Sequence, residues 1–171
     1  MKTRLVLTLA LIGLLTNVIA QKNPNWTKWN WIIGEWNGEG SGQPGQGGGT
    51  FNFAFDLDHK IIVRKSHSEY PSSDNKPAIV HNDLMVIYPD STGIPSKAIY
   101  FDNEGHTINY SLTYHDFSIV FLSDRSNNEP IFRLTYTMRD IATANTKFEI
   151  SQDGKNFTTY IEGMSQKVKP K

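Results

Sequence analysis

The residues of this chain that could carry chemistry are histidines, carboxylates, arginines and tyrosines, because the sequence contains no cysteine. That composition excludes disulfide scaffolds, thiolate zinc sites, iron–sulfur clusters and cysteine nucleophiles. Asp102 and His106 flank a three-residue loop in which Gly105 suits the left-handed position that ends such a hairpin. The hairpin sets the carboxylate opposite the imidazole, where it fixes the tautomer and raises the pKa of the ring. This pair is a candidate general base or ligand clamp, or a contact that only stabilises the hairpin; no residue is assigned as catalytic.

His67, His81 and Asp83 form a second candidate constellation, for a metal. If the loop between their strands is symmetric about Asp74, His67 lies opposite His81 and Lys65 lies opposite Asp83. Two imidazoles and a carboxylate would suit zinc or iron with one open position. The alternative is that these histidines are solvated or hydrogen-bonded, so the metal ligands stay unknown.

Two arginines lie within expected strands and suit bidentate binding of a carboxylate ligand. Arg133 stands between Phe132 and Leu134, and alternation places it on the outward face. The phase of Arg64 stays open, because both faces of its strand begin apolar and become polar. Arg64 is therefore kept among the candidate ligand-binding residues.

The elements that must position these residues are mostly strands. Residues 24–33 carry Trp26, Trp29 and Ile33 at helical spacing and predict one short helix. From Glu35 onward the apolar period changes to two, and turn signals recur at even spacing. The predicted strands span 35–42, 50–57, 60–69, 80–88, 97–102, 106–114, 117–122, 131–137, 146–151 and 157–167. The prediction is an all-β fold, a single antiparallel up-and-down barrel of about ten strands, since closure removes exposed edges.

Two tight turns predict which face of three strands is buried. The first hairpin pairs Tyr100 with Ile108 and Ala98 with Tyr110; the second, with a turn at residues 115–116, pairs Tyr110 with Phe121. Both registers place the aromatic face inward. The resulting interior has polar tips on an apolar wall, which suits a small-ligand cavity. Its predicted ligand-binding residues are Tyr100, Asp102, His106, Tyr110, Tyr114 and Arg64.

The net charge limits the classes of partner, and the N-terminal residues predict where the protein is located. The 171 residues include 17 basic and 17 acidic side chains, which argues against nucleic acid as a partner. Residues 1–20 combine Lys2 and Arg4 with an apolar run and small residues at 18 and 20, the pattern of a cleaved signal peptide. Cleavage removes two basic residues and leaves a net charge of −2. Residues 21–171 then form a single barrel domain, secreted or periplasmic, with no membrane insertion after cleavage.

The segment Ile32-Ile33-Gly34-Glu35-Trp36-Asn37-Gly38-Glu39-Gly40 carries a family resemblance. A short helix followed by Gly-x-Trp resembles the start of calycin-type barrels, which include lipocalins and fatty-acid-binding proteins. The longer Gly-x-Trp-x-Gly-x-Gly form is similar to the opening of nitrobindin-like barrels and of uncharacterised exported bacterial proteins. Residues 82–88, 99–106 and 132–136 look similar to those same barrels. The resemblance implies a ten-stranded barrel that binds an apolar ligand.

This sequence departs from the family pattern at two places. Nitrobindin-like haem binders supply a histidine from the last strand, whereas the last strand here contains Tyr160 and no histidine. Tyrosine ligates haem in some proteins, so haem stays an alternative and the cofactor stays unknown. Lipocalins carry an arginine near the chain end that packs on the tryptophan, and here only Lys167, Lys169 and Lys171 are available.

The sequence as a whole predicts an exported barrel that binds a small apolar or amphipathic molecule. A second hypothesis is a hydrolase or isomerase in which an Asp102-oriented His106 moves a proton in the same cavity. A third is a haem-binding or metal-binding barrel. A fourth is a barrel with a filled interior that serves as a structural or interaction module.

Overall fold

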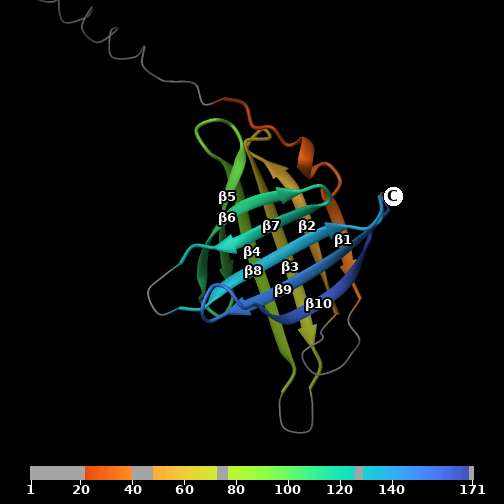
Figure 1. Cartoon of the computed structure of the whole chain (residues 1–171). Coiled ribbons are helices and arrows are strands. Elements are labelled where there is room, and N and C mark those ends of the chain that lie inside the picture. Colours follow the sequence, from red (N-terminus) through yellow and green to blue (C-terminus); the bar gives the residue numbers. More distant parts are fainter. Residues whose placement is uncertain (1–21, 40–47, 73–76, 126–128, 170–171) are drawn as a thin grey trace, which may run out of the picture.

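The computed structural model describes residues 22–39, 48–72, 77–125 and 129–169, and they form one closed antiparallel barrel (Figure 1). The expected signal peptide, residues 1–20, lies outside these ranges. The strands are β1 (Gly34–Gly38), β2 (Gly48–Asp56), β3 (Ile61–Tyr70), β4 (Ile79–Pro89), β5 (Pro95–Asp102), β6 (Thr107–His115), β7 (Ser118–Ser123), β8 (Ile131–Met138), β9 (Thr143–Ser151) and β10 (Thr158–Lys167). Each strand pairs with its sequence neighbours, and β1 pairs with β10 to close the barrel.

The predicted fold class is confirmed, with ten strands in up-and-down order. The first strand ends at Gly38 rather than at residue 42, and residues 40–42 lie outside the described ranges. The other strands differ from their predicted bounds by at most three residues. No helix among the described residues has the length and apolar character that crossing a membrane requires.

The predicted helix over 24–33 is a single 3-10 turn at Thr27–Trp29. The Trp29 N–H donates to the Trp26 carbonyl at 2.8 Å, and the Ile32 N–H donates to the Trp29 carbonyl at 3.0 Å. A period of three residues per turn places Trp26, Trp29 and Ile32 on one face. All three are buried, whereas Ile33 is only partly buried, because the tighter turn replaces the α-helical spacing of the prediction.

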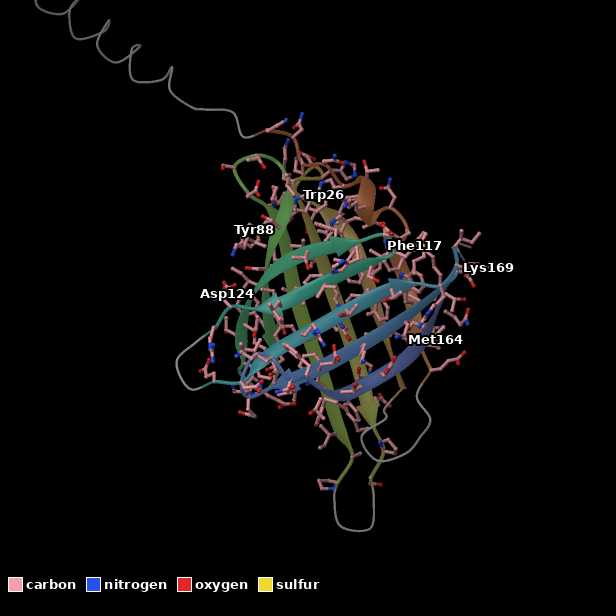
Figure 2. The ribbon with its side chains drawn as sticks, in the orientation of Figure 1. Trp26, Tyr88, Phe117, Asp124, Met164 and Lys169 are labelled. Carbon is pink, nitrogen blue, oxygen red and sulfur yellow. The ribbon has the colours of Figure 1, made fainter. Side chains whose placement is uncertain are left out.

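This 3-10 turn lies over one end of the barrel, here called the closed end, which Figure 2 shows with Trp26 and Phe117 nearby. The Trp26 indole donates to the His59 carbonyl at 2.8 Å, and the Trp36 indole donates to the Ile32 carbonyl at 2.8 Å. The Lys167 ammonium donates to the Trp31 carbonyl at 2.7 Å and lies 5.2 Å from the Trp36 ring. Lys167 therefore occupies the place that the resemblance gives to an arginine.

The opposite end, here called the open end because the 3-10 turn does not cover it, contains the β5–β6 and β9–β10 turns, the last residues of β3 and the first residues of β4 (Figure 1). The β5–β6 register is as predicted, with Tyr100 opposite Ile108 and Ala98 opposite Tyr110. Gly105 has a φ of 94°, the left-handed conformation on which that prediction depends.

The β6–β7 register differs from the prediction by two residues. Tyr114 lies opposite Ile119, and Tyr110 lies opposite Ser123 rather than Phe121. The turn therefore sits one residue later than predicted, which leaves Phe117 at its tip and largely exposed. A shift of two residues keeps every side chain on its face, so the aromatic face still points inward.

Candidate functional site

A buried ion pair between Arg64 of β3 and Asp83 of β4 lies inside the open half of the barrel. The two side chains are 9% and 6% exposed. The guanidinium carbon also lies 5.8 Å from the ring centres of both Phe51 and Tyr136. Arg64 therefore lies on the inward face of β3. A buried cation needs a partner of opposite charge, and Asp83 provides it.

A chain of polar contacts runs from this ion pair to the open end. The second oxygen of Asp83 lies 3.7 Å from the Nε2 atom of His81. The Nε2 atom of His81 lies 2.9 Å from the Tyr100 hydroxyl, and its Nδ1 donates to Glu104 at 3.0 Å. Tyr100 also donates to Asp102 at 3.3 Å. The Tyr100 hydroxyl has a single proton and lies within hydrogen-bond distance of both His81 and Asp102, so it donates to one of them at a time.

Asp102 and His106 meet at the rim of the open end, as the hairpin predicts. The Nδ1 atom of His106 donates to Asp102 at 2.8 Å, and the same carboxylate accepts the N–H groups of Glu104 and His106 at 3.0 and 2.9 Å. Burial raises the pKa of Asp102, but these hydrogen bonds outweigh it and hold the pKa below 3.8. The Asp102 side chain is 4% exposed and the His106 side chain is 62% exposed. The carboxylate is thus fixed while the ring faces the solvent.

The pH dependence of this pair gives a direct prediction. The hydrogen bond to Asp102 and the attraction to its charge raise the pKa of His106 above 6.5. The ion pair therefore stabilises the fold below pH 6.5 and loses that contribution as the pH rises through the folded-state pKa. At the acid end the contribution is lost as Asp102 is protonated, at a pH below 3.8. We expect NMR titration of Asp102→Asn to show the His106 pKa falling toward 6.5.

His67 provides the internal control for that titration. Its pKa is raised by hydrogen bonds to Asn82 and Glu69, which lie on the outer face. The His67 pKa should not change in Asp102→Asn. An unchanged His106 pKa in the variant would show that the carboxylate does not control the ring.

Three buried side-chain atoms have no hydrogen-bond partner among the described residues: Arg64 Nε, Tyr136 Oη and Thr146 Oγ1. Tyr136 on β8 lies directly opposite Thr146 on β9, and Arg64 reaches the Tyr136 ring across the barrel. Burial raises the pKa of Tyr136 to about 12, and both the charge of the Arg64 guanidinium and its closeness to the Tyr136 hydroxyl act in the opposite direction. Buried polar atoms in native proteins nearly always have partners. The three atoms, here called the Arg64–Tyr136–Thr146 site, are therefore candidate contacts for a bound group.

The barrel wall beside Thr146 is lined by a residue without a side chain. The partner of Thr146 on β10 is Gly163, and a Cβ atom placed there would meet one described atom within 4 Å, the Glu39 carbonyl at 3.6 Å. The next inward residues of this wall are also small, with Gly38 paired to Ser165. Sequence reasoning missed Tyr136 and Thr146 as site residues. The alternation of side chains that places Arg133 on the outer face also predicts that Tyr136 points inward. The sequence has no tight turn between the two strands that would predict Thr146 as the residue opposite Tyr136.

The predicted ligand-binding residues do not all lie together. Tyr100, Asp102, His106 and Arg64 belong to the polar chain of the open half. Tyr110 is 2% exposed, and its ring packs edge-on against Tyr100 and Phe121 at 6.5 and 6.1 Å.

Tyr114 lies at the other end of the barrel. It accepts the Trp29 indole N–H at 2.9 Å and donates to the Pro95 carbonyl. Arg133 faces outward as predicted, where it bonds Glu149 at 2.7 Å and stacks on Phe157 at 3.9 Å.

The predicted pairing behind the metal constellation is wrong. His67 lies opposite Asn82, and His81 lies opposite Ser68. This is a slip of one residue, which turns His67 to the outer face while His81 and Asp83 point inward. No group of three or more His, Asp or Glu side chains in the described ranges is arranged to hold a metal ion.

Haem ligation from the last strand does not fit the described residues. Tyr160 is the extra residue of a bulge between Thr159 and Ile161. Its side chain is 68% exposed, with its ring edge on Phe148 at 6.3 Å. An axial ligand would have to point from β10 into the barrel.

Two surface cavities, of about 390 and 330 Å³, lie at the closed end rather than beside the polar chain. The first is bordered by Lys22, Lys60 and Tyr88, and the second by Lys28, Trp31 and Phe117. Neither includes a residue of the Arg64–Tyr136–Thr146 site.

Comparison with known proteins assigns no family to this chain, so its architecture is what the comparison can be related to. No protein-family model matches the sequence, and no curated protein matches it either. The closed antiparallel ten-strand barrel is consistent with a calycin-like barrel.

Proposed function

We propose that this protein is an exported binding protein for a small apolar or amphipathic molecule, which enters through the open end and places a polar group at the Arg64–Tyr136–Thr146 site. The observation that carries the proposal is a set of three buried polar atoms without a hydrogen-bond partner among the described residues, on Arg64, on Tyr136, whose ring lies 5.8 Å from the guanidinium carbon, and on Thr146, which lies opposite Tyr136 in the sheet. A ligand that supplies their missing hydrogen bonds removes a desolvation cost of about 1–3 kcal/mol for each atom.

Two further features support this proposal. Aromatic side chains lie beside the site, since the Phe51 and Tyr136 rings are each 5.8 Å from the guanidinium carbon and Phe53 packs edge-on against Tyr136 at 5.3 Å. An apolar wall with a few convergent polar groups is the usual form of a small-molecule site. The pattern of residues 1–20 supports export and location outside the cytoplasm, in the periplasm or the medium.

Native mass spectrometry tests occupancy directly. The mature protein is purified from its natural host compartment, and its native mass is compared with its denatured mass. We expect an excess native mass that disappears on denaturation. A native mass equal to that of the bare polypeptide would contradict the proposal.

Gly163→Leu is the matched variant, because it adds a side chain beside Thr146 on a backbone that accepts any residue. It should lose the excess mass while keeping the barrel's circular dichroism. Thr135→Leu, on the outward face of β8 opposite Lys147, is the control and should keep the excess mass.

A second candidate function is proton transfer by His106 as a hydrolase or isomerase. The observation that favours it is the 2.8 Å bond by which the immobilised Asp102 carboxylate orients the imidazole. A bell-shaped pH profile of activity that is lost in His106→Ala would support this function. The absence of any turnover across substrate screens would leave the binding function alone.

A further inference from the structure

We propose that the Arg64–Tyr136–Thr146 site binds a neutral hydrogen-bond-accepting group, such as an amide or ketone carbonyl, and discriminates against carboxylates. This inference deepens the proposed function and depends on it. The site contains one N–H donor on Arg64 and two hydroxyls on Tyr136 and Thr146, none of which forms a hydrogen bond of good geometry with the described residues, although the Arg64 side chain lies close to the Tyr136 hydroxyl. A carbonyl oxygen accepts from two such donors at once.

The charge around the site argues for a neutral ligand group. The guanidinium already forms an ion pair with Asp83, whose side chain is 6% exposed. A second buried carboxylate, Asp102, lies opposite Asp83 in the β4–β5 register. His81 lies 3.7 Å from Asp83 and bonds Glu104, the other titratable groups that act on Arg64 are Tyr100, Tyr110 and Tyr136, and His106 balances Asp102 at the rim.

A ligand carboxylate would therefore add an uncompensated negative charge to a buried network that already contains two carboxylates. Taking such a charge out of water is costly unless it meets its own cation. A neutral acceptor satisfies the same donors without that cost. The rings of Phe51 and Tyr136, which contact each other and lie beside the guanidinium, further suit an uncharged ligand body.

The test compares two molecules of equal length, decanamide and decanoate, by isothermal titration calorimetry with the mature protein at neutral pH. We expect the amide to bind more tightly by about tenfold or more. Binding of the acid should strengthen when the pH falls below its own pKa, because the neutral form then enters. Tighter binding of decanoate at neutral pH would overturn the inference and leave the proposed function intact.

Asp83→Asn sharpens this comparison. The asparagine still accepts a hydrogen bond from Arg64 but leaves its charge uncompensated, so the preference should reverse toward decanoate. Asp124→Asn is the control, because Asp124 is 53% exposed and pairs with Lys97 on the surface, and it should keep the preference for the amide.

The calorimetric titrations of the wild type and of Asp83→Asn have three further possible outcomes. An unchanged preference in a folded Asp83→Asn would overturn the charge argument. If Asp83→Asn does not fold, the wild-type comparison decides by itself. Binding of neither molecule would overturn the inference, whereas the proposed function is decided by the native mass.

Discussion

Replacing Trp29 by alanine is expected to lower the free energy of unfolding by about 3–5 kcal/mol. Trp29 is fully buried and packs against Trp26, Phe53, Tyr114 and Phe121, with ring centres 6.0–6.3 Å apart. The variant removes this packing and leaves the Tyr114 hydroxyl without the indole N–H it accepts at 2.9 Å. Urea denaturation followed by far-UV circular dichroism measures the effect, because that signal does not depend on the deleted fluorophore.

Two companion variants separate packing from hydrogen bonding. Trp29→Phe keeps most of the ring and removes the indole N–H, so it should cost about 1–2 kcal/mol. Phe117→Ala changes a residue that is 62% exposed at the same end and should change stability by less than about 0.5 kcal/mol. A cost below about 1.5 kcal/mol for Trp29→Ala would contradict the view that the 3-10 turn completes the core.

The closed end and the open half therefore differ in chemistry. At the closed end, indole N–H groups are bonded to backbone carbonyls or to Tyr114, and aromatic edges fill the space. In the open half, the ion pair of Arg64 and Asp83 extends into a polar chain that ends at the rim. Aromatic packing stabilises the first, whereas a buried ion pair stabilises the second, where the proposed binding function lies.

The sequence predicts most of this fold because period-two alternation and turn residues are local signals. The β5–β6 hairpin is predictable with its register because Gly105 admits one short loop geometry. The predicted β6–β7 register is wrong by two residues, since the neighbouring positions 115–116 and 116–117 both suit a turn. The predicted helix is too long because a 3-10 turn buries its residues with a period of three.

The candidate site is harder to predict because it depends on pairings across long loops. A slip of one residue between β3 and β4 moves His67 to the outer face and removes the metal hypothesis. Both faces of the strand that contains Arg64 begin apolar and become polar, so the alternation of side chains does not predict whether Arg64 points inward or outward. The meeting of Arg64 with Tyr136 joins strands on opposite sides of the barrel, and no local pattern encodes that contact.

Removal of the Asp83 carboxylate is the second large effect that we expect. Asp83→Ala leaves the guanidinium of Arg64 buried without its counter-charge, which should lower the free energy of unfolding by about 3–5 kcal/mol. The cost arises from the stranded charge more than from the lost contact itself. Chemical denaturation of the purified variant measures it, with Asp124→Ala as the surface control, for which less than about 1 kcal/mol is expected.

A double-mutant cycle distinguishes a stranded charge from a simple loss of packing. Arg64→Met combined with Asp83→Ala removes both charges, so the double variant should be more stable than Asp83→Ala alone, because no unpaired charge remains in the barrel. If the losses in unfolding free energy of the two single variants simply add in the double variant, Arg64 and Asp83 do not stabilise the open half as a unit. A strong coupling would instead show that Asp83 keeps Arg64 neutralised in place, which is the condition that the proposed site needs in order to present an unpaired N–H donor without a net charge.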